Sequence, residues 1–295
     1  MSVLRRGELP PLLRAIHDPP ARLYLRGVGE PEVLSRTAVA IVGARACSPY
    51  GAQVARMLGR ELAASGVVVV SGLARGIDGE AHRGALAAGG HTIAVLGCGI
   101  DRDYPAAHAR LALQICERSL IVSEYEPGVE PAPWRFPARN RIIAGLCAAT
   151  IVVEARERSG ALITADFALE EGREVFAVPG EITSALSSGT NALLRLGATP
   201  LTSGADVLEA LGIEQPQAQS APPVGDVAAS LLTHLPAAVD ELTRATGLDA
   251  AQVAAALAEL ELSGLAAEGD GIYRGISPGA AASSVRDLGR AGPRE

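Results

Sequence analysis

Apolar and polar residues alternate along the chain in blocks that predict strands and helices in turn. Short apolar runs rich in β-branched residues predict strands at 38–42, 67–70, 92–96, 120–122, 150–153 and 174–178. Apolar residues at helical spacing predict helices at 51–64, 78–88, 106–116, 140–146, 161–171, 190–196 and 204–211. Strands that alternate with helices form parallel βαβ units. The pattern therefore predicts an α/β domain with a doubly wound parallel sheet covered on both faces.

The composition changes after this region. Residues 212–225 are rich in Gln, Pro, Ala and Ser, which is typical of a linker. Three short helical patterns and a hairpin follow, and they predict a small winged-helix domain at 226–276. We expect a disordered tail at 277–295, where Gly, Ala, Ser and Arg predominate. Residues 1–35 form a short lead-in to a main domain at 36–211.

The charges are unevenly distributed. The chain has a net charge of −7, and all 26 of its basic residues are arginines. Residues 36–211 hold 16 arginines and 18 acidic residues, whereas residues 212–276 hold 2 arginines and 9 acidic residues. A near-neutral main domain can carry a local basic stripe that binds phosphates. The acidic C-terminal domain would repel DNA, so we interpret it as a protein-contact or regulatory domain.

Several protein classes are disfavoured. No apolar stretch reaches the roughly 18 residues of a membrane helix, and the first 20 residues lack the apolar region of a signal peptide, so we expect a cytoplasmic protein. The four cysteines show no CxxC spacing, and the five histidines show no metal-ligand spacing. GxSxG and Walker A motifs are absent, and the chain has no lysine for Schiff-base chemistry. We therefore predict no catalytic residue, no metal and no cofactor.

Three glycine-rich turns follow predicted strands, at 43–45, 71–78 and 97–99. In a parallel sheet such turns lie together at one edge, where glycines let backbone amides approach an anion. Two of these turns also carry an arginine, Arg45 and Arg75. The alternative is that the glycines only make tight turns. We favour that alternative for any single turn, but not for two turns that each carry an arginine.

Two further segments suit nucleic-acid chemistry. Residues 134–141 combine two aromatic residues with three arginines, and such side chains stack bases and bind phosphates. Phe136 could instead be a core residue, and one arginine could pair with Glu124 or Glu126. The segment beginning with Ser159-Gly160 follows a strand and opens a helix. Ser159 could cap that helix only, or the helix N-terminus could also bind an anion.

The motifs resemble those of the DNA-processing protein A (DprA/Smf) family. The similarity covers residues 40–197 and includes IVGAR (41–45), SGLARGID (71–78), TIAVLGCGID (92–101), FPARNRIIAGL (136–146) and GTNALLRLGA (189–198). The resemblance implies an extended Rossmann-like fold that binds single-stranded DNA without hydrolysing anything. It also implies protection of incoming DNA, loading of the RecA recombinase in natural transformation, and a homodimer formed through this domain.

The resemblance also implies a set of DNA-binding residues. These are Gly43, Arg45, Ser71, Gly72, Arg75, Gly76, Phe136, Arg139, Asn140 and Arg141, to which the helix N-terminus adds Ser159 and Gly160. One position departs from the family pattern. Relatives often carry a basic residue after Tyr104-Pro105, where this chain has Ala106-Ala107. Whether His108 or Arg110 replaces that residue is left open, and the apolar residues Leu193, Leu194 and Leu196 are a candidate dimer patch.

Two enzymatic interpretations compete with DNA binding. Related Rossmann-like folds include nucleotide-phosphate hydrolases of the lysine-decarboxylase-like type, which use a PGGxGTxxE loop. The equivalent segment here is SGALITADFALE, which lacks the double glycine and displaces the glutamate to Glu170. A nicotinamide-dependent oxidoreductase is disfavoured because no turn carries the GxGxxG fingerprint.

Overall fold

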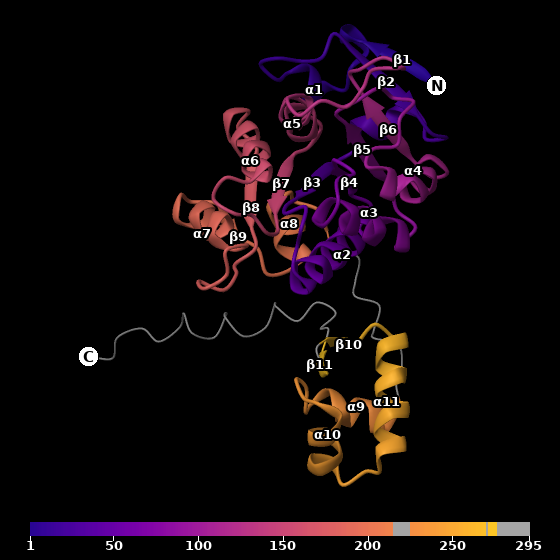
Figure 1. Ribbon diagram of the computed structural model, residues 1–295, viewed down its shortest axis with the longest axis vertical. Coiled ribbons are helices and arrows are strands. Elements are labelled where there is room, and N and C mark those ends of the chain that lie inside the picture. Colours follow the sequence, from indigo (N-terminus) through magenta and orange to yellow (C-terminus); the bar gives the residue numbers. More distant parts are fainter. Residues whose placement is uncertain (215–224, 270, 276–295) are drawn as a thin grey trace, which may run out of the picture. The chain divides into compact units, whose positions relative to one another are not determined.

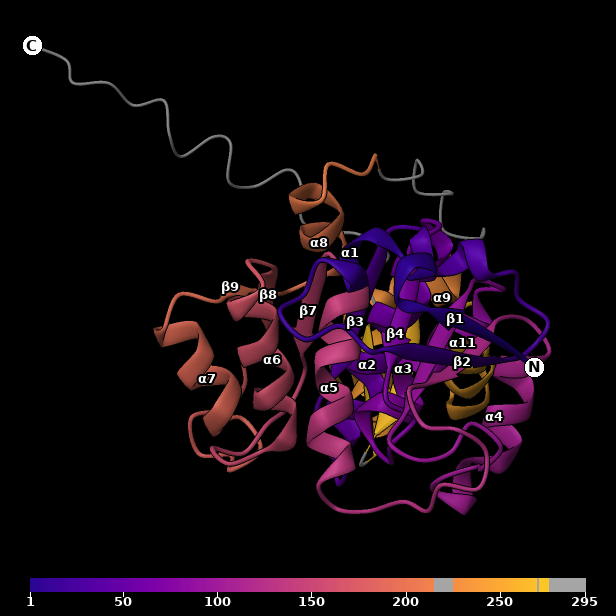
Figure 2. The same cartoon turned by 90° about the horizontal axis from the view of Figure 1, so that it is seen from above.

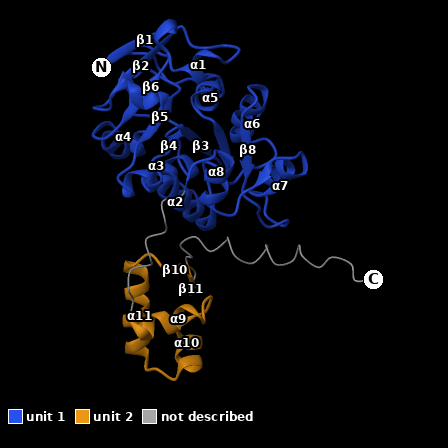
Figure 3. Ribbon diagram, turned by 180° about the vertical axis from the view of Figure 1, so that it is seen from behind, with its two compact units in different colours: residues 1–214 blue, residues 215–295 orange. Residues whose placement is uncertain are grey.

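The chain forms two compact units, Met1–Glu214 and Gln215–Glu295 (Figure 3). A computed structural model describes residues 1–214, 225–269 and 271–275. The predicted tail and most of the predicted linker lie outside these residues. Each unit is described by itself, and the predicted domain bounds stay a prediction.

The first unit is built on one twisted sheet (Figures 1 and 2). Within the described residues the sheet has nine strands in the order β1-β2-β6-β5-β4-β3-β7-β8-β9. Strands β3 to β9 are parallel, whereas β1 and β2 run antiparallel to their neighbours. The strands are β1 (Ser2–Arg5), β2 (Arg22–Arg26), β3 (Ala38–Val42), β4 (Val68–Ser71), β5 (Thr92–Leu96), β6 (Leu120–Ser123), β7 (Ala149–Val152), β8 (Glu174–Ala177) and β9 (Thr199–Pro200).

Helices pack on both faces of this sheet. One face carries α2 (Pro49–Ala64), α3 (Ile77–Ala87), α4 (Ala109–Cys116) and α8 (Gly204–Ala210). The other carries α1 (Pro11–Arg14), α5 (Arg135–Leu146), α6 (Gly160–Glu170) and α7 (Ser188–Arg195). Short 3₁₀ helices are η1 (Arg6–Glu8), η2 (Pro31–Ser35) and η3 (Ala106–His108). The predicted doubly wound α/β architecture is confirmed.

The central strand β3 shows why the strand sequences are continuously apolar. All five of its residues are buried. Ala38, Ala40 and Val42 pack in the core beneath α5 and α6, while Val39 and Ile41 pack in the core beneath α2 and α3. A strand covered on both faces has no solvent-facing position, so the two-residue alternation of polar and apolar residues disappears.

Two local features differ from the sequence expectation. The lead-in contains β1 and β2, and β2 buries Leu23 and Leu25 while it pairs with β6 about 100 residues away. The fifth helix, predicted from Asn140, begins at Arg135. Pro137 is tolerated there because it occupies the first turn, where backbone amides have no acceptor within the helix. The 136–141 segment is therefore helical.

The second unit has three helices and a two-stranded hairpin, as the winged-helix prediction requires. Its elements are α9 (Asp226–Leu232), α10 (Val239–Thr246), α11 (Ala250–Leu262), β10 (Ala266–Gly269) and β11 (Ile272–Gly275). A separate apolar core joins the three helices, and it includes Leu231, Leu242, Val253 and Leu260. The third helix, α11, carries no basic residue.

Helices α2 and α3 pack closely because glycines face the opposing backbone. A Cβ atom on Gly59 would meet the carbonyl oxygen of Ala81, and one on Gly84 would meet the carbonyl oxygen of Arg56. Backbone atoms cannot move aside as flexible side chains do. These two glycines therefore set the separation of the helices that lead out of the turns after β3 and β4.

We predict that Gly84→Ala destabilises the protein, although alanine favours a helix interior by about 1 kcal/mol. The added methyl group would collide with backbone and lower the free energy of unfolding by about 1–3 kcal/mol. Gly160→Ala is the control, because a Cβ atom there meets nothing within 4 Å. Chemical denaturation should separate the two variants, and a Gly84→Ala protein as stable as the wild type would contradict the prediction.

Candidate functional site

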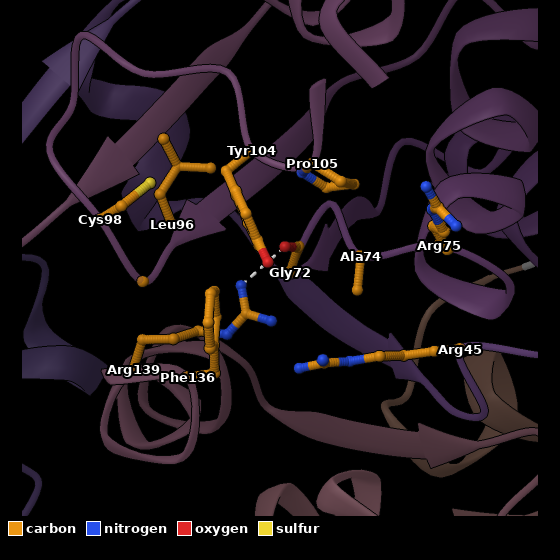
Figure 4. A pocket seen from close by; sticks show the side chains of 11 residues that line it. Arg45, Gly72, Ala74, Arg75, Leu96, Cys98, Tyr104, Pro105, Phe136 and Arg139 are labelled. Carbon is orange, nitrogen blue, oxygen red and sulfur yellow. Dashed lines mark hydrogen bonds between the residues drawn. The ribbon is translucent and has the colours of Figure 1, made fainter. Parts of the chain in front are cut away.

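The turns after the parallel strands meet at one edge of the sheet and, with α5, border two adjoining cavities. Cavity 1 has a volume of about 210 Å³, and cavity 2 has a volume of about 200 Å³. They share Arg45, Ala74, Phe136 and Arg139 as lining residues. Figure 4 shows cavity 1, whose other lining residues are Gly72, Arg75, Leu96, Gly97, Cys98, Tyr104 and Pro105.

Cavity 1 has a cationic edge. Arg45 follows β3 and Arg75 follows β4, and both side chains are exposed. Within the described residues neither guanidinium group forms a salt bridge. No acidic residue lines this cavity among those described. The two exposed guanidinium groups are therefore available to an anionic ligand such as a phosphate.

An aromatic pair forms the other side of cavity 1. The rings of Tyr104 and Phe136 stack with centroids 5.3 Å apart and an interplanar angle of 26°. The Arg45 guanidinium carbon lies 5.4 Å from the Phe136 centroid, within cation–π range. Tyr104 comes from the loop after β5, and Phe136 comes from the first turn of α5. Aromatic faces beside unpaired cations form a surface suited to nucleobases joined by phosphates.

A buried ion pair lies next to cavity 1 and fixes the turns that line it. The Arg139 side chain is 6% exposed and lies 3.9 Å from the Asp78 carboxylate, itself 7% exposed. Arg139 Nη1 donates to the carbonyl oxygens of Gly72, at 2.7 Å, and Val95. Burial raises the pKa of the Asp78 carboxyl, an effect that Arg139 and two backbone amides oppose. Arg139 therefore ties α5 to the ends of β4 and β5.

Two backbone amides of the second turn are already bonded to a side chain of the same turn. Asp78 Oδ2 accepts hydrogen bonds from the amides of Gly72, at 3.1 Å, and Ala74, at 3.3 Å. These amides are consequently not the free anion donors that the glycine pattern suggests. The exposed Arg75 side chain can still contact an anion, and Asp78 fixes the loop that presents it.

The same turn contains a strained residue. Leu73 is fully buried and has a φ of 57°, a left-handed conformation that is costly for a residue with a Cβ atom. His108 Nδ1 lies 3.0 Å from the Leu73 carbonyl oxygen. Because a carbonyl only accepts, Nδ1 carries the proton. His108 is buried and holds the loop, so it does not supply an exposed cation after Tyr104-Pro105.

Three predicted site glycines are required by packing. A Cβ atom on Gly72 would overlap the Arg139 guanidinium group, and one on Gly43 would lie 2.6 Å from the Ile77 side chain. Gly76 has a φ of 74°, and its Cβ atom would meet the Ala44 carbonyl oxygen. All three glycines bring turns closer together than a larger residue allows.

Three predicted site residues line neither cavity, namely Ser71, Gly76 and Arg141. The Ser71 hydroxyl is buried and donates to the Ile41 carbonyl oxygen at 2.6 Å. Arg141 forms a bidentate ion pair with Glu124, at 2.7 and 2.9 Å, and its Nε bonds Asp18 at 2.9 Å. The sequence left open whether an arginine of this segment pairs with Glu124, and Arg141 is the one that does. Arg141 lies outside both cavities. Arg110 is exposed on α4 and lines neither cavity.

The remaining predicted residues lie around cavity 2. Gly43, Asn140, Ser159 and Gly160 line it together with Asp78 and Thr164. The Ser159 hydroxyl caps α6 by accepting from the Ala161 amide at 3.3 Å. Glu170 is the last residue of α6, so about 9 Å of helix separates it from Thr164, the last α6 residue that lines the cavity. It is not positioned for the general-base role expected of a hydrolase loop.

Two residues of the site were missed in the sequence-based set. Asp78 organises the second turn, and its place at the end of SGLARGID was an available signal, since an acid at a helix N-terminus often accepts backbone amides. Tyr104 stacks on a residue 32 positions away, which no local pattern indicates.

No group of three or more potential metal ligands is found in residues 1–214, 225–269 and 271–275. No helix in that part of the chain is long and apolar enough to cross a membrane.

Comparison with known proteins identifies the family. The family model for DNA recombination-mediator protein A matches residues 1–212, and the model for the DprA winged helix domain matches residues 214–271. The chain belongs to the DprA/Smf family. This result confirms the resemblance in the sequence motifs and the winged-helix interpretation of the second unit.

Named relatives and solved structures agree. The chain is 50% identical to the DNA processing protein DprA of Streptococcus pneumoniae over 196 residues, which cover 66% of this chain and 68% of that protein. It is 42% identical to Protein Smf of Escherichia coli over 278 residues, or 90% and 74% of the two chains.

The solved S. pneumoniae DprA structure matches with a TM-score of 0.68 and 47% identity, covering 70% of this chain and 73% of that one. A structure of the Helicobacter pylori protein matches with a TM-score of 0.65 and 34% identity, covering 71% and 94%. That structure is described as showing a unique single-stranded DNA binding mode.

We predict that Asp78→Ala lowers the free energy of unfolding by about 3–5 kcal/mol, because it leaves a buried guanidinium group without its partner. Asp18→Ala is the matched control. Its carboxylate is 74% exposed and also contacts an arginine, so its loss should cost at most about 1 kcal/mol. Urea denaturation of both variants measures the difference, and equal stabilities would show that the Asp78–Arg139 pair does not support the fold.

Proposed function

We propose that the chain binds single-stranded DNA along cavity 1. The observation that carries this proposal is that Arg45 and Arg75, which form no salt bridge among the described residues, line the same cavity as the Tyr104–Phe136 stack. Guanidinium groups would bind phosphates, and exposed aromatic faces would stack bases of any sequence. The single-stranded DNA binding described for the H. pylori relative supports the same assignment.

We propose three roles within the predicted site. Arg45 and Arg75 contact phosphates, and Phe136 stacks a base. Gly43, Gly72 and Gly76 let the turns approach one another, while Ser71, Arg139 and Asn140 hold the loops through buried hydrogen bonds. Arg141 is bound to Glu124 and contributes to folding instead of binding.

The proposed binding is not enzymatic. A strand held by stacking and ion pairs is protected without being cleaved, which suits a protein that shelters incoming DNA in the cytoplasm and loads RecA on it during natural transformation. The description of the matching family as recombination mediators supports this role. A stimulation of RecA filament formation on single strands by the purified protein would test it.

The binding proposal is tested by titrating labelled single-stranded and duplex oligonucleotides over a salt series. We expect the single strand to bind more tightly, because paired bases cannot reach an aromatic stack and the third helix of the second unit, α11, carries no arginine to place in a groove. We also expect little dependence on base sequence. Equal or tighter duplex binding would overturn the proposal.

In the same titration we predict that Arg45→Ala and Arg75→Ala each weaken single-strand binding about tenfold, or about 1.4 kcal/mol. Each should also reduce the slope of log affinity against log salt by about 0.7, because one phosphate contact is lost. Arg60→Ala is the control, because Arg60 is also exposed but lies on α2 and lines neither cavity. A loss of affinity at constant slope would assign the two arginines a structural role.

We also propose a homodimer through the first unit, as the family resemblance implies. The candidate patch needs correction, because Leu193 belongs to the core and Leu194 packs against it. Leu196 is 84% exposed, however, and Ile182 is 96% exposed in the same region between β8 and β9. Two large apolar side chains so fully exposed are candidates for an interface.

We predict that Leu196→Glu gives a monomer by light scattering at micromolar concentration. The thermal midpoint of the variant should fall only by the amount that loss of the dimer accounts for, because Leu196 is exposed and does not belong to the core. Leu113→Glu is the control, because Leu113 is 60% exposed on α4. The control should stay dimeric. A wild-type protein that is monomeric at these concentrations would remove the dimer from the proposal.

We further propose that the second unit does not contact DNA, since residues 212–276 hold 9 acidic residues and 2 arginines. Deletion of residues 212–295 should therefore leave single-strand affinity within about threefold of the wild type, with a small gain at low salt, where charge repulsion is screened least. Circular dichroism would check that the first unit stays folded. A tenfold loss of affinity would show that this unit binds the strand directly.

A further inference from the structure

Cavity 2 lies at the point in the sheet where the strand order reverses. From β3 the chain proceeds through β4, β5 and β6 on one side, and through β7, β8 and β9 on the other. The helices after β3 and β7 therefore lie on opposite faces, which leaves a crevice beyond the carboxyl ends of these two strands. Cavity 2 is lined by Val42 and Gly43 at the end of β3, and by residues 159–161 in the connection from β7 to α6.

The N-terminus of α6 faces this cavity. Ser159 caps the Ala161 amide, and the Leu162 amide donates to the Ser159 carbonyl oxygen. The Gly160 amide has no acceptor within the described part of the chain. A helix N-terminus with a free amide attracts an anion, and α6 is 11 residues long.

A buried hydroxyl in cavity 2 independently indicates a polar ligand. Thr164 is 1% exposed and lines the cavity one turn into α6. Threonines in helices commonly donate to the carbonyl oxygen four residues earlier, as Thr243 does to Val239. No hydrogen bond of the Thr164 hydroxyl is present among the described residues, and the Gly160 carbonyl oxygen instead accepts from Asn140 Nδ2 at 3.1 Å. The Thr164 side chain is buried apart from the cavity that it lines, so a ligand in the cavity can bond its hydroxyl group.

The position of the α6 N-terminus is fixed through the buried ion pair. Arg139 Nε donates to Asn140 Oδ1 at 3.1 Å, and Asn140 in turn binds α6 through Gly160. The charged residues that line cavity 2 are Arg45, Arg139 and Asp78, which gives a net positive lining. The cavity is therefore preorganised and attractive to an anion.

The volume limits what can bind. About 200 Å³ is less than the roughly 300–1,000 Å³ of sites that enclose drug-sized ligands, so a dinucleotide cofactor does not fit. The volume of cavity 2 is larger than the volume of a phosphate ion. Phe136, Pro137 and Ile143 form an apolar wall of the cavity. A phosphate with one attached apolar or aromatic group matches this combination.

We propose that cavity 2 binds the terminal phosphate of a nucleotide, with the phosphate at the Gly160 amide and the Thr164 hydroxyl. The source is either a free nucleoside monophosphate or the phosphorylated end of a strand. A terminal phosphate carries about −1.5 to −2 charges and three acceptor oxygens, whereas a phosphate within a strand carries one charge and two free oxygens. Cavity 2 adjoins cavity 1 and shares Arg45 and Phe136 with it, but Gly160 and Thr164 line cavity 2 and not cavity 1, so phosphate binding there does not require a strand in cavity 1.

Calorimetric titration of the full chain with thymidine 5′-monophosphate, thymidine and inorganic phosphate tests the proposal. Short oligonucleotides with a 5′-phosphate, a 3′-phosphate or neither distinguish the two sources. We expect the monophosphate, a phosphorylated strand end, or both to bind at least tenfold more tightly than the matching ligand without the phosphate. Inorganic phosphate that binds as tightly as every nucleotide ligand would overturn the nucleotide assignment.

Gly160→Asp is the decisive variant. Its side chain enters open space and its charge favours a helix N-terminus, so the protein should remain folded while phosphate is repelled. Gly7→Asp is the matched control, since Gly7 is also exposed and open to a Cβ atom. We expect Gly160→Asp to weaken phosphate-dependent binding at least tenfold, Thr164→Val at least threefold, and Gly7→Asp not at all.

Two results would overturn the proposal. One is a wild-type protein that prefers no phosphorylated ligand at millimolar concentration. The other is a phosphate preference that survives both Gly160→Asp and Thr164→Val. Binding of an unphosphorylated strand is measured in parallel, so that a failure of cavity 2 is distinguished from a failure of strand binding in cavity 1.

Discussion

The candidate site depends on one buried contact, the ion pair between Arg139 on α5 and Asp78 at the start of α3. Each partner also bonds backbone: Arg139 bonds the carbonyl oxygens of Gly72 and Val95, and Asp78 bonds the amides of Gly72 and Ala74. Removing two charges from water is costly, and only such additional hydrogen bonds offset the cost. The pair therefore joins two strands and two helices at the point where the turns must be held still.

The arginines of the site fall into two groups with different tasks. Arg139 and Arg141 are bound to carboxylates, and their charges are neutralised within the fold. Arg45 and Arg75 have no such partner among the described residues and stand at the cavity edge. Because the loops are already fixed by the first group, the second group can meet a ligand without a further cost of ordering the backbone.

Sequence patterns predicted the parallel strands β3 to β8, the helices between them and the edge where the turns meet, but not the short parallel strand β9. They did not predict β2, because a five-residue strand with arginines at both ends is stabilised by pairing with the distant β6. The patterns also could not distinguish the role of Arg139 from that of Arg141, because the two residues lie two positions apart in a single motif. Helical geometry turns the two side chains to different faces, and only the positions of Asp78 and Glu124 determine which partner each one finds. Cavity 2 is formed by four segments that lie apart in the sequence, and no sequence pattern predicts the cavity itself.

The cavity edge is cationic through guanidinium groups only, since the chain contains no lysine. Cells commonly tune DNA affinity by acetylating lysine amines, which removes one positive charge for each modified residue. Arginine has no corresponding amine and stays protonated throughout the physiological pH range. The positive charge of this edge is therefore constant, and its affinity for a strand can be altered by a competing ligand, by salt or by a protein that covers it.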